Sequence, residues 1–135
     1  LKGIDLAVSR GEFVAIVGKS GKAFMSPSPT YAGAKAALLG YVKGLARECA
    51  PFGVTANAVC PGWVRTAAAL RSLAAMAQAQ GRSTADVERE ILARQAVPTM
   101  LTPEELAGVF LFLASDGAAP LTGQCLVASH GEVMA

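Results

Sequence analysis

The hydrophobic positions of this chain fall into short, continuous apolar runs separated by longer stretches with helical spacing. Apolar runs occupy residues 11–18, 53–60 and 123–129, and each begins at a glycine. Their length and continuity predict buried strands of a parallel sheet. The segment GIDLAV, residues 3–8, alternates in the manner of a fourth strand.

Helical spacing of apolar residues predicts helices over residues 31–50, 67–79, 83–95 and 102–115. The last of these has the clearest start signal. Thr102 is a capping residue, Pro103 suits the first helical position, and Glu105 suits the positive end of the helix dipole.

The order strand, helix, strand, helices, strand is typical of parallel β-α-β units with right-handed crossovers. It predicts an α/β fold, a three-layer, partial Rossmann-like parallel sheet of three or four strands flanked by helices. The chain has 135 residues, the size of one ordinary domain, so residues 1–135 are expected to form a single α/β domain.

Composition narrows the classes of function. Hydrophobic residues make up 53% and charged residues 16%, which fits a covered sheet and excludes disorder. The net charge is +2 and the basic residues are scattered, which argues against nucleic acid as a partner. No apolar run is long enough for a membrane helix and the start lacks a signal-peptide pattern, so we expect a soluble, cytoplasmic protein.

The cysteines do not predict a metal centre. Cys49, Cys60 and Cys125 are far apart in the sequence, and His130 is the only histidine. A zinc site needs ligands at closer spacing. We expect reduced, buried thiols and no bound metal.

The first 21 residues resemble the start of an ATP-binding-cassette ATPase, where such a strand leads into a phosphate-binding Walker A loop. That loop requires G-x-x-x-x-G-K-[ST]. Counting back from Gly21 and Lys22 places Ile16 at the first glycine and Ala23 at the metal-binding hydroxyl, and the register from Gly18 fails as well. The loop is therefore broken, which leaves only weak phosphate binding by residues 18–22 as an alternative.

Tyr31 and Lys35 are four residues apart at the start of a predicted helix and therefore share one face, about one turn apart. An ammonium group beside a phenol favours the ionised phenolate and suits it to proton transfer. A Tyr-x-x-x-Lys pair is a weak signal without its context.

The context is the stretch YAGAKAALLGYVKGLARECAPFGVTANAVCPGWVRT, followed later by LTPEELAGVFLFLASDGAAPLTGQCLVASHG. Together they resemble the C-terminal half of the short-chain dehydrogenase/reductase family over about residues 24–135. The resemblance implies that Tyr31 is the general acid/base and that Lys35 favours its ionised form and binds the nicotinamide ribose. It also implies a turn that lines the nicotinamide and its phosphates, made by Pro61, Gly62, Val64 and Thr66.

The resemblance assigns further roles outside this turn. Residues 66–97 would be the variable segment that covers the substrate. We interpret Asn57 as structural, Trp63 as a hydrophobic cover, and His130 as a local hydrogen-bonding residue.

The chain departs from the family pattern at two points. The family's catalytic serine stands thirteen residues before the tyrosine, where this chain has Gly18, and Ser20 is only a weak substitute. The glycine-rich dinucleotide turn G-x-G-x-x-G is also absent from the 135 residues. Joining the two resemblances near residues 21–22 suggests a chimera of an ATPase-like segment and half of a dehydrogenase.

These features leave four functional hypotheses. The first is a dehydrogenase-derived domain that retains Tyr31 and Lys35 but is inactive alone. The second is a residual NAD(P)-dependent oxidoreductase that acts on a small-molecule carbonyl or alcohol through oligomerisation, with NAD or NADP as cofactor. The third is a purely structural or oligomerising module, and the last is a nucleotide-phosphate binder through residues 18–22.

Half of a doubly wound sheet would leave an apolar strand edge uncovered, and such edges recruit other chains. We therefore expect a homo-oligomer, which pairs these edges or buries the helix of residues 31–50 against a copy of itself.

Overall fold

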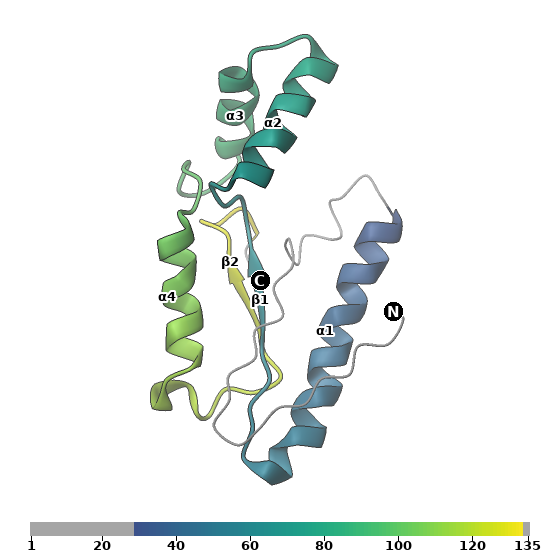
Figure 1. The fold of residues 1–135 in the computed structure, drawn as a ribbon, viewed down its shortest axis with the longest axis vertical. Helices are drawn as coiled ribbons and strands as arrows, with labels where there is room; N and C mark the ends of the chain where they lie inside the picture. The colour runs from purple at the N-terminus through teal and green to yellow at the C-terminus, as the bar shows by residue number, and fades with distance from the viewer. Residues whose placement is uncertain (1–28, 134–135) are drawn as a thin grey trace.

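The computed structural model describes residues 29–133. Its elements, in chain order, are α1 (Pro29–Cys49), η2 (Ala50–Phe52), β1 (Ala58–Pro61), α2 (Ala67–Gln80), α3 (Thr84–Leu92), α4 (Pro103–Leu113), η3 (Asp116–Ala118) and β2 (Cys125–Ala128). Figure 1 shows the two strands between α4 on one side and α1 on the other, with the α2–α3 hairpin at one end. The fold is mixed α/β and mostly helical.

The two strands form a parallel pair, in which Ala58 lies opposite Cys125 and Pro61 opposite Ala128. The strands are shorter than the sequence predicts at residues 53–60 and 123–129. Gly53 adopts a left-handed conformation, φ 70°, and ends η2. β1 therefore begins only at Ala58. The predicted strands at residues 3–8 and 11–18 lie outside the described residues.

One face of the sheet packs against α4 and the turn that follows it. Val59, Leu113 and Ala118 are buried there, and partly buried apolar residues surround them: Leu106, Val109, Phe110, Leu121, Leu126 and Ala128. Because side chains alternate along a strand, Val59 and Leu126 point to this face. Ala58, Cys60 and Cys125 belong to the opposite face.

The side chain of Asn57 links the segments that lead into β1 and β2. The Nδ2 of Asn57 donates to the carbonyl of Leu121 at 2.9 Å, and its Oδ1 accepts from the backbone N–H of Gln124 at 3.1 Å. The side chain thus takes the place of ladder bonds where β1 and β2 begin. The structural role predicted for Asn57 is confirmed.

A second core lies inside the α2–α3 hairpin. Leu73 is completely buried, and Ala77, Val87, Leu92 and Met100 are buried around it. Trp63 packs against this cluster, which confirms its interpretation as a hydrophobic cover. The hairpin therefore has its own interior, separate from the one beneath the sheet.

The helix start signals read from the sequence are confirmed. Thr102 and Glu105 form a reciprocal capping box, with bonds of 3.1 Å and 2.7 Å. At α3, the Ser83 hydroxyl accepts from the N–H of Asp86 at 3.1 Å and donates to its carboxylate at 2.6 Å. The Ser83 bond, followed by the 2.9 Å bond from Arg89, lowers the pKa of Asp86.

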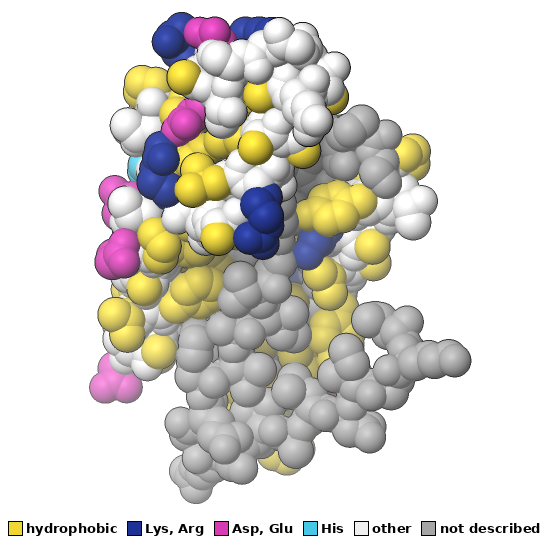
Figure 2. Space-filling view, turned by 45° about the horizontal axis from the view of Figure 1, so that its top comes forward, with side chains coloured by type: hydrophobic (Ala, Val, Ile, Leu, Met, Phe, Trp, Pro, Cys, Tyr) yellow, Lys and Arg dark blue, Asp and Glu magenta, His cyan; other side chains and the backbone are white. Residues whose placement is uncertain are grey.

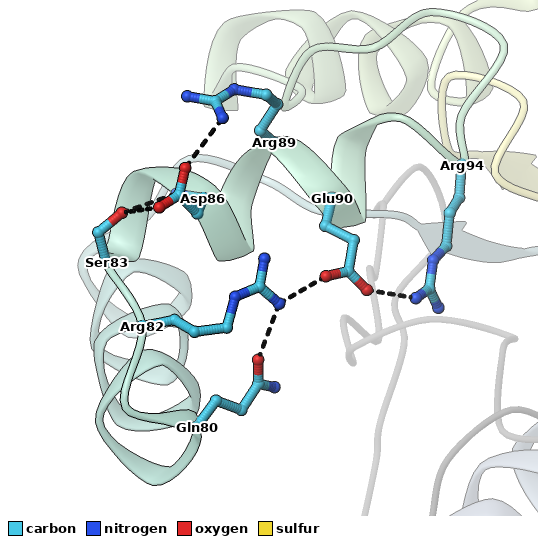
Figure 3. Close-up of polar contacts among 7 residues, drawn as sticks. All are labelled: Gln80, Arg82, Ser83, Asp86, Arg89, Glu90 and Arg94. Atoms are coloured by element: carbon cyan, nitrogen blue, oxygen red, sulfur yellow. Dashed lines mark hydrogen bonds and ion pairs between the residues drawn. The ribbon is translucent and has the colours of Figure 1, made fainter.

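Arginines hold Glu90 on the exposed side of the hairpin (Figure 3). Arg82 donates to one carboxylate oxygen at 2.6 Å and Arg94 to the other at 2.9 Å. The hydrogen bond and charge of Arg82, and then the bond from Arg94, lower the pKa of Glu90 below its usual 4.5.

The contacts of Glu90 predict that the folded chain loses a small part of its stability in acid. A carboxylate with a lowered folded-state pKa stabilises the fold above its ordinary titration range, and this stabilisation is lost as the pH falls through the lowered pKa. Between about pH 7 and about pH 3, the Tm of the native chain should therefore fall slightly more than that of Glu90→Gln. Circular dichroism melts at low salt measure this, with the exposed Glu48→Gln as control; equal acid losses in native chain and Glu90→Gln would contradict it.

The cysteines correct one expectation. Cys60 is buried, Cys49 is partly buried and Cys125 is exposed, so only Cys60 matches the expectation of buried thiols. β2 lies at the surface on its second face, which exposes Cys125. None of the three forms a disulfide.

The surface of the described part carries mixed charge. On the face in Figure 2, basic and acidic side chains are interspersed among apolar ones, without an extended patch of one sign. Within residues 29–133 no helix is both long enough and apolar enough to cross a membrane. In the same range, no three His, Cys, Asp or Glu residues gather as a metal-binding group would.

Candidate active site

Tyr31 and Lys35 lie in the first two turns of α1, which begins at Pro29. Proline suits the start of a helix because the first N–H groups have no partner within the helix. The Lys35 ammonium lies 5.7 Å from the centre of the Tyr31 ring. This contact joins the two residues that the sequence paired, and Tyr31 remains 36% exposed at the surface.

Residues 61–66 form a continuous turn from the end of β1 to the start of α2. This turn contains the four residues predicted to line the cofactor, Pro61, Gly62, Val64 and Thr66. The N–H of Gly62 donates to the carbonyl of Ala128 at 2.9 Å, which extends the pairing with β2 by one residue. A Cβ at Gly62 would lie 2.9 Å from the Cα of Ser129, closer than real Cβ contacts. Only glycine fits there without a shift of the backbone.

The backbone N–H of Val64 takes no part in the pairing with the neighbouring segment around Leu101. Val64 and Leu101 form an isolated parallel bridge, whose bonds run from Arg65 N–H to Leu101 O and from Leu101 N–H to Trp63 O. The carbonyl of Val64 accepts from Thr66. No bond within residues 29–133 uses the N–H of Val64, which leaves it as an open main-chain donor.

Thr66 caps the start of α2. Its hydroxyl oxygen accepts from the N–H of Ala69 at 3.2 Å, and its hydroxyl hydrogen is available to donate. The first N–H groups of α2 carry the positive end of the helix dipole, which favours an anion. The turn therefore ends in hydrogen-bond donors, namely the Thr66 hydroxyl and the first N–H groups of α2.

Two contacts that the sequence did not predict attach the turn of residues 61–66 to neighbouring segments. Arg65 forms an ion pair with Glu88 of α3, which ties the turn to the hairpin. Leu101 supplies both backbone bonds of the bridge described above. No local pattern marks either residue, because each contact joins positions more than twenty residues apart.

His130 supports the segment beneath the turn. Its Nδ1 lies 2.9 Å from the carbonyl of Thr99 and 3.2 Å from that residue's hydroxyl. Its own carbonyl accepts from the N–H of Val97 at 3.0 Å. Its φ of 52° is uncommon for a residue with a side chain. The predicted local hydrogen-bonding role is confirmed.

The start of α1 and the carboxyl ends of both strands lie toward the same end of the molecule (Figure 1). Tyr31 and Lys35 therefore belong to the end at which the turn of residues 61–66 leaves the sheet. Ser20, and the loop of residues 18–22, lie outside the described residues, so the serine substitute and the phosphate-binding alternative stay predictions.

A family model described as enoyl-(acyl carrier protein) reductase matches residues 3–132. The chain belongs to the short-chain dehydrogenase/reductase family. The match runs through residues 3–21, and nothing in the comparisons supports an ATPase segment or a chimera. A short buried strand followed by a glycine turn is common to both families, which explains the misleading likeness of the first 21 residues.

Curated relatives agree with this membership of the short-chain dehydrogenase/reductase family. The chain is 35% identical over 128 residues to the 3-oxoacyl-[acyl-carrier-protein] reductase of Escherichia coli, covering 94% of this chain and 45% of that protein. It is 34% identical over 114 residues to the D-beta-hydroxybutyrate dehydrogenase of Cupriavidus necator, covering 84% and 44%. The chain thus spans less than half the length of these relatives.

Solved short-chain dehydrogenase/reductase structures share the fold. A short chain dehydrogenase family protein from Francisella tularensis matches with a TM-score of 0.78 and 27% identity, over 84% of this chain and 48% of that one. An actinorhodin polyketide ketoreductase solved with NADPH matches with a TM-score of 0.76 and 31% identity, over 84% and 44%. The Rossmann-like architecture predicted for the described elements agrees with these neighbours.

Proposed function

We propose that this chain supplies the proton-transfer pair and the nicotinamide-side turn of an NAD(P)-dependent carbonyl reductase, and that it is inactive alone. The observation that carries the proposal is the Lys35 ammonium 5.7 Å from the Tyr31 ring. The pair sits at the start of α1, toward the end of the molecule where the turn of residues 61–66 leaves the sheet.

The residues of the turn fit a nicotinamide cofactor. The open N–H of Val64 is a donor for the oxygen of a carboxamide, and the Thr66 hydroxyl is a donor for a carboxamide or a phosphate. The ammonium of Lys35 offers three donors for ribose hydroxyls. Pro61 is buried at the end of β1 and gives this end of the site a rigid wall.

Tyr31 would act as the general acid. When bound, the reduced nicotinamide supplies a hydride to the carbonyl carbon. The Tyr31 hydroxyl would give its proton to the carbonyl oxygen, and Lys35 would stabilise the phenolate that remains. The Arg65–Glu88 ion pair would keep the α2–α3 hairpin over the turn, where it excludes water from the reacting groups.

Two features of the sequence support inactivity of the 135-residue chain alone. Gly18 stands where the family has its serine, and loss of one such polarising donor costs about a hundredfold or more in rate. The glycine-rich turn that holds the adenosine side of the cofactor is not among these residues. For residual oxidoreductase activity, that half of the site would have to come from residues outside this 135-residue sequence.

Exposed aromatic residues favour association of the isolated chain. Tyr41 on α1 is 52% exposed and Phe52 just after the helix is 77% exposed. Only Val42 and Ala46 of α1 are buried, and an apolar face left exposed is typical of a surface that a partner covers. We propose a homo-oligomer in which α1 lies against a second copy of this chain, which is one of the two arrangements expected from the sequence, the other being the pairing of strand edges.

A fusion enzyme tests the catalytic assignment. Residues 24–135 are joined behind the amino-terminal half of the Escherichia coli 3-oxoacyl reductase, which supplies a dinucleotide turn and a serine by its family pattern. The fusion should oxidise NADPH with an acetoacetyl thioester, and Tyr31→Phe should lower kcat by about a hundredfold or more, because a positioned general acid contributes that much. NADPH absorbance measures the rate.

The control is Tyr41→Phe on the same helix, which removes an identical hydroxyl and should leave the rate unchanged. Equal losses in both tyrosine variants would contradict the assignment. The unfused chain should show no turnover, and turnover that Tyr31→Phe abolishes would instead establish a residual oxidoreductase. Light scattering on the unfused chain tests association, and a monomer at micromolar concentration would contradict it.

A further inference from the structure

Cys60 and Cys125 meet on the paired strands. Cys60 is in β1 and Cys125 in β2, two ladder positions apart on the same face, because Ala58 lies opposite Cys125 and Cys60 opposite Val127. Their Sγ atoms are 3.1 Å apart, although the residues are separated by 65 positions in the sequence. The backbone ladder, and not the thiols, holds the two strands at this distance.

We propose that Cys60 and Cys125 form a dithiol site that a small-molecule disulfide oxidises to an intramolecular disulfide. A disulfide bond is about 2.05 Å long, so the sulfur atoms need to approach by about 1 Å, and because the two residues are diagonal and not directly opposite, the backbone of the two strands has to move locally as well. The two Cβ atoms project from the same face of a parallel pair.

The difference in exposure sets the order of the steps. Cys125 is exposed and Cys60 is buried. The Cys125 thiolate attacks one sulfur of the oxidant, which forms a mixed disulfide and releases the first small thiolate. The Cys60 thiolate then attacks the Cys125 sulfur and releases the second. Two electrons pass to the oxidant, and the two thiol protons go to its two released thiolates.

The position of the bond gives it a measurable consequence. It would close a loop of 65 positions and restrict the unfolded chain, which stabilises the fold. Oxidation should therefore raise the Tm by about 10 °C. The bond would also lie directly before Pro61, at the start of the turn of residues 61–66. This site is independent of the proposed reductase function.

Oxidised glutathione and mass spectrometry test the proposal on the native chain. The intact mass should fall by about 2 Da, for two hydrogens, and then return under dithiothreitol. Trypsin leaves Cys49 and Cys60 in one peptide, residues 48–65, and Cys125 in another, residues 95–135. The experiment is therefore run on Cys49→Ser, where a bond between these two peptides can only join Cys60 and Cys125.

The variants separate the outcomes. Cys49→Ser should lose the two hydrogens and show the higher Tm, whereas Cys60→Ser and Cys125→Ser should show neither. Cys60→Ala replaces Cys60→Ser if the buried hydroxyl prevents folding. A lasting glutathione adduct on Cys125 in the native chain would overturn the proposal. So would a native chain that does not react while the urea-unfolded chain oxidises.

Discussion

Leu73→Ala is expected to lower the free energy of unfolding by about 3 kcal/mol or more, the largest loss from any single truncation in the hairpin. Leu73 is completely buried between α2 and α3, against Ala77 and Val87. Its removal loses the transfer free energy of the side chain and leaves a cavity that two short helices fill only in part. Urea unfolding followed by the fluorescence of Trp63, the single tryptophan, measures the loss at this cluster.

Leu70 provides the matched control. It lies on the same helix, three residues before Leu73, and is 40% exposed. Leu70→Ala should cost under about 1 kcal/mol, because less apolar surface returns to water. Equal losses from the two substitutions would mean that α2 and α3 do not enclose Leu73 as described.

Gly62→Ala is expected to destabilise the chain by about 1–3 kcal/mol, since it overpacks the end of the sheet. The new Cβ would lie 2.9 Å from the Cα of Ser129 and 3.2 Å from a carboxylate oxygen of Glu132. The Ser129 backbone has little freedom to move, because its carbonyl accepts from Glu132 and its hydroxyl bonds Val133. The substitution should therefore break the bond from Gly62 to Ala128.

Gly44→Ala is the control for this prediction. Gly44 lies inside α1, and a Cβ there would meet nothing within 4 Å. The same change should stabilise the chain by about 0.5–1 kcal/mol, because alanine is the better helix former. Urea unfolding measures both variants. A Gly62→Ala chain as stable as the native one would show that Ser129 lies further from the turn.

Local signals in the sequence predicted the helices well. The reciprocal bonds of Thr102 and Glu105 depend on a spacing of three residues, which the sequence displays directly. The Tyr31 and Lys35 pair was found for the same reason, since four residues on a helix bring two side chains together. Each of these features is decided by neighbours in the chain.

Contacts between distant segments were not predictable. The apolar run of residues 53–60 gives no sign that β1 starts only at Ala58, because the start depends on where the partner strand begins. The approach of Cys60 to Cys125 likewise follows from the register of the sheet. The open N–H of Val64 depends on its bridge to Leu101, which is also a tertiary contact.

The comparisons give the chimera hypothesis no support, for a related reason. A buried strand followed by glycines has few distinguishing residues, so a short segment resembles more than one family. The longer comparison, over residues 3–132, uses many weak positions together and assigns the whole stretch to one family.

The pairing of β1 with β2 also bears on the order in which the chain folds. Most of the described chain lies between the two strands, so their meeting must close a long loop against its conformational entropy. The α2–α3 hairpin lies within that loop and is built from contacts between near neighbours in sequence. Local contacts form faster than distant ones. The hairpin is thus placed to fold early and to shorten the remaining loop, and the closing of the sheet sets the pace of folding.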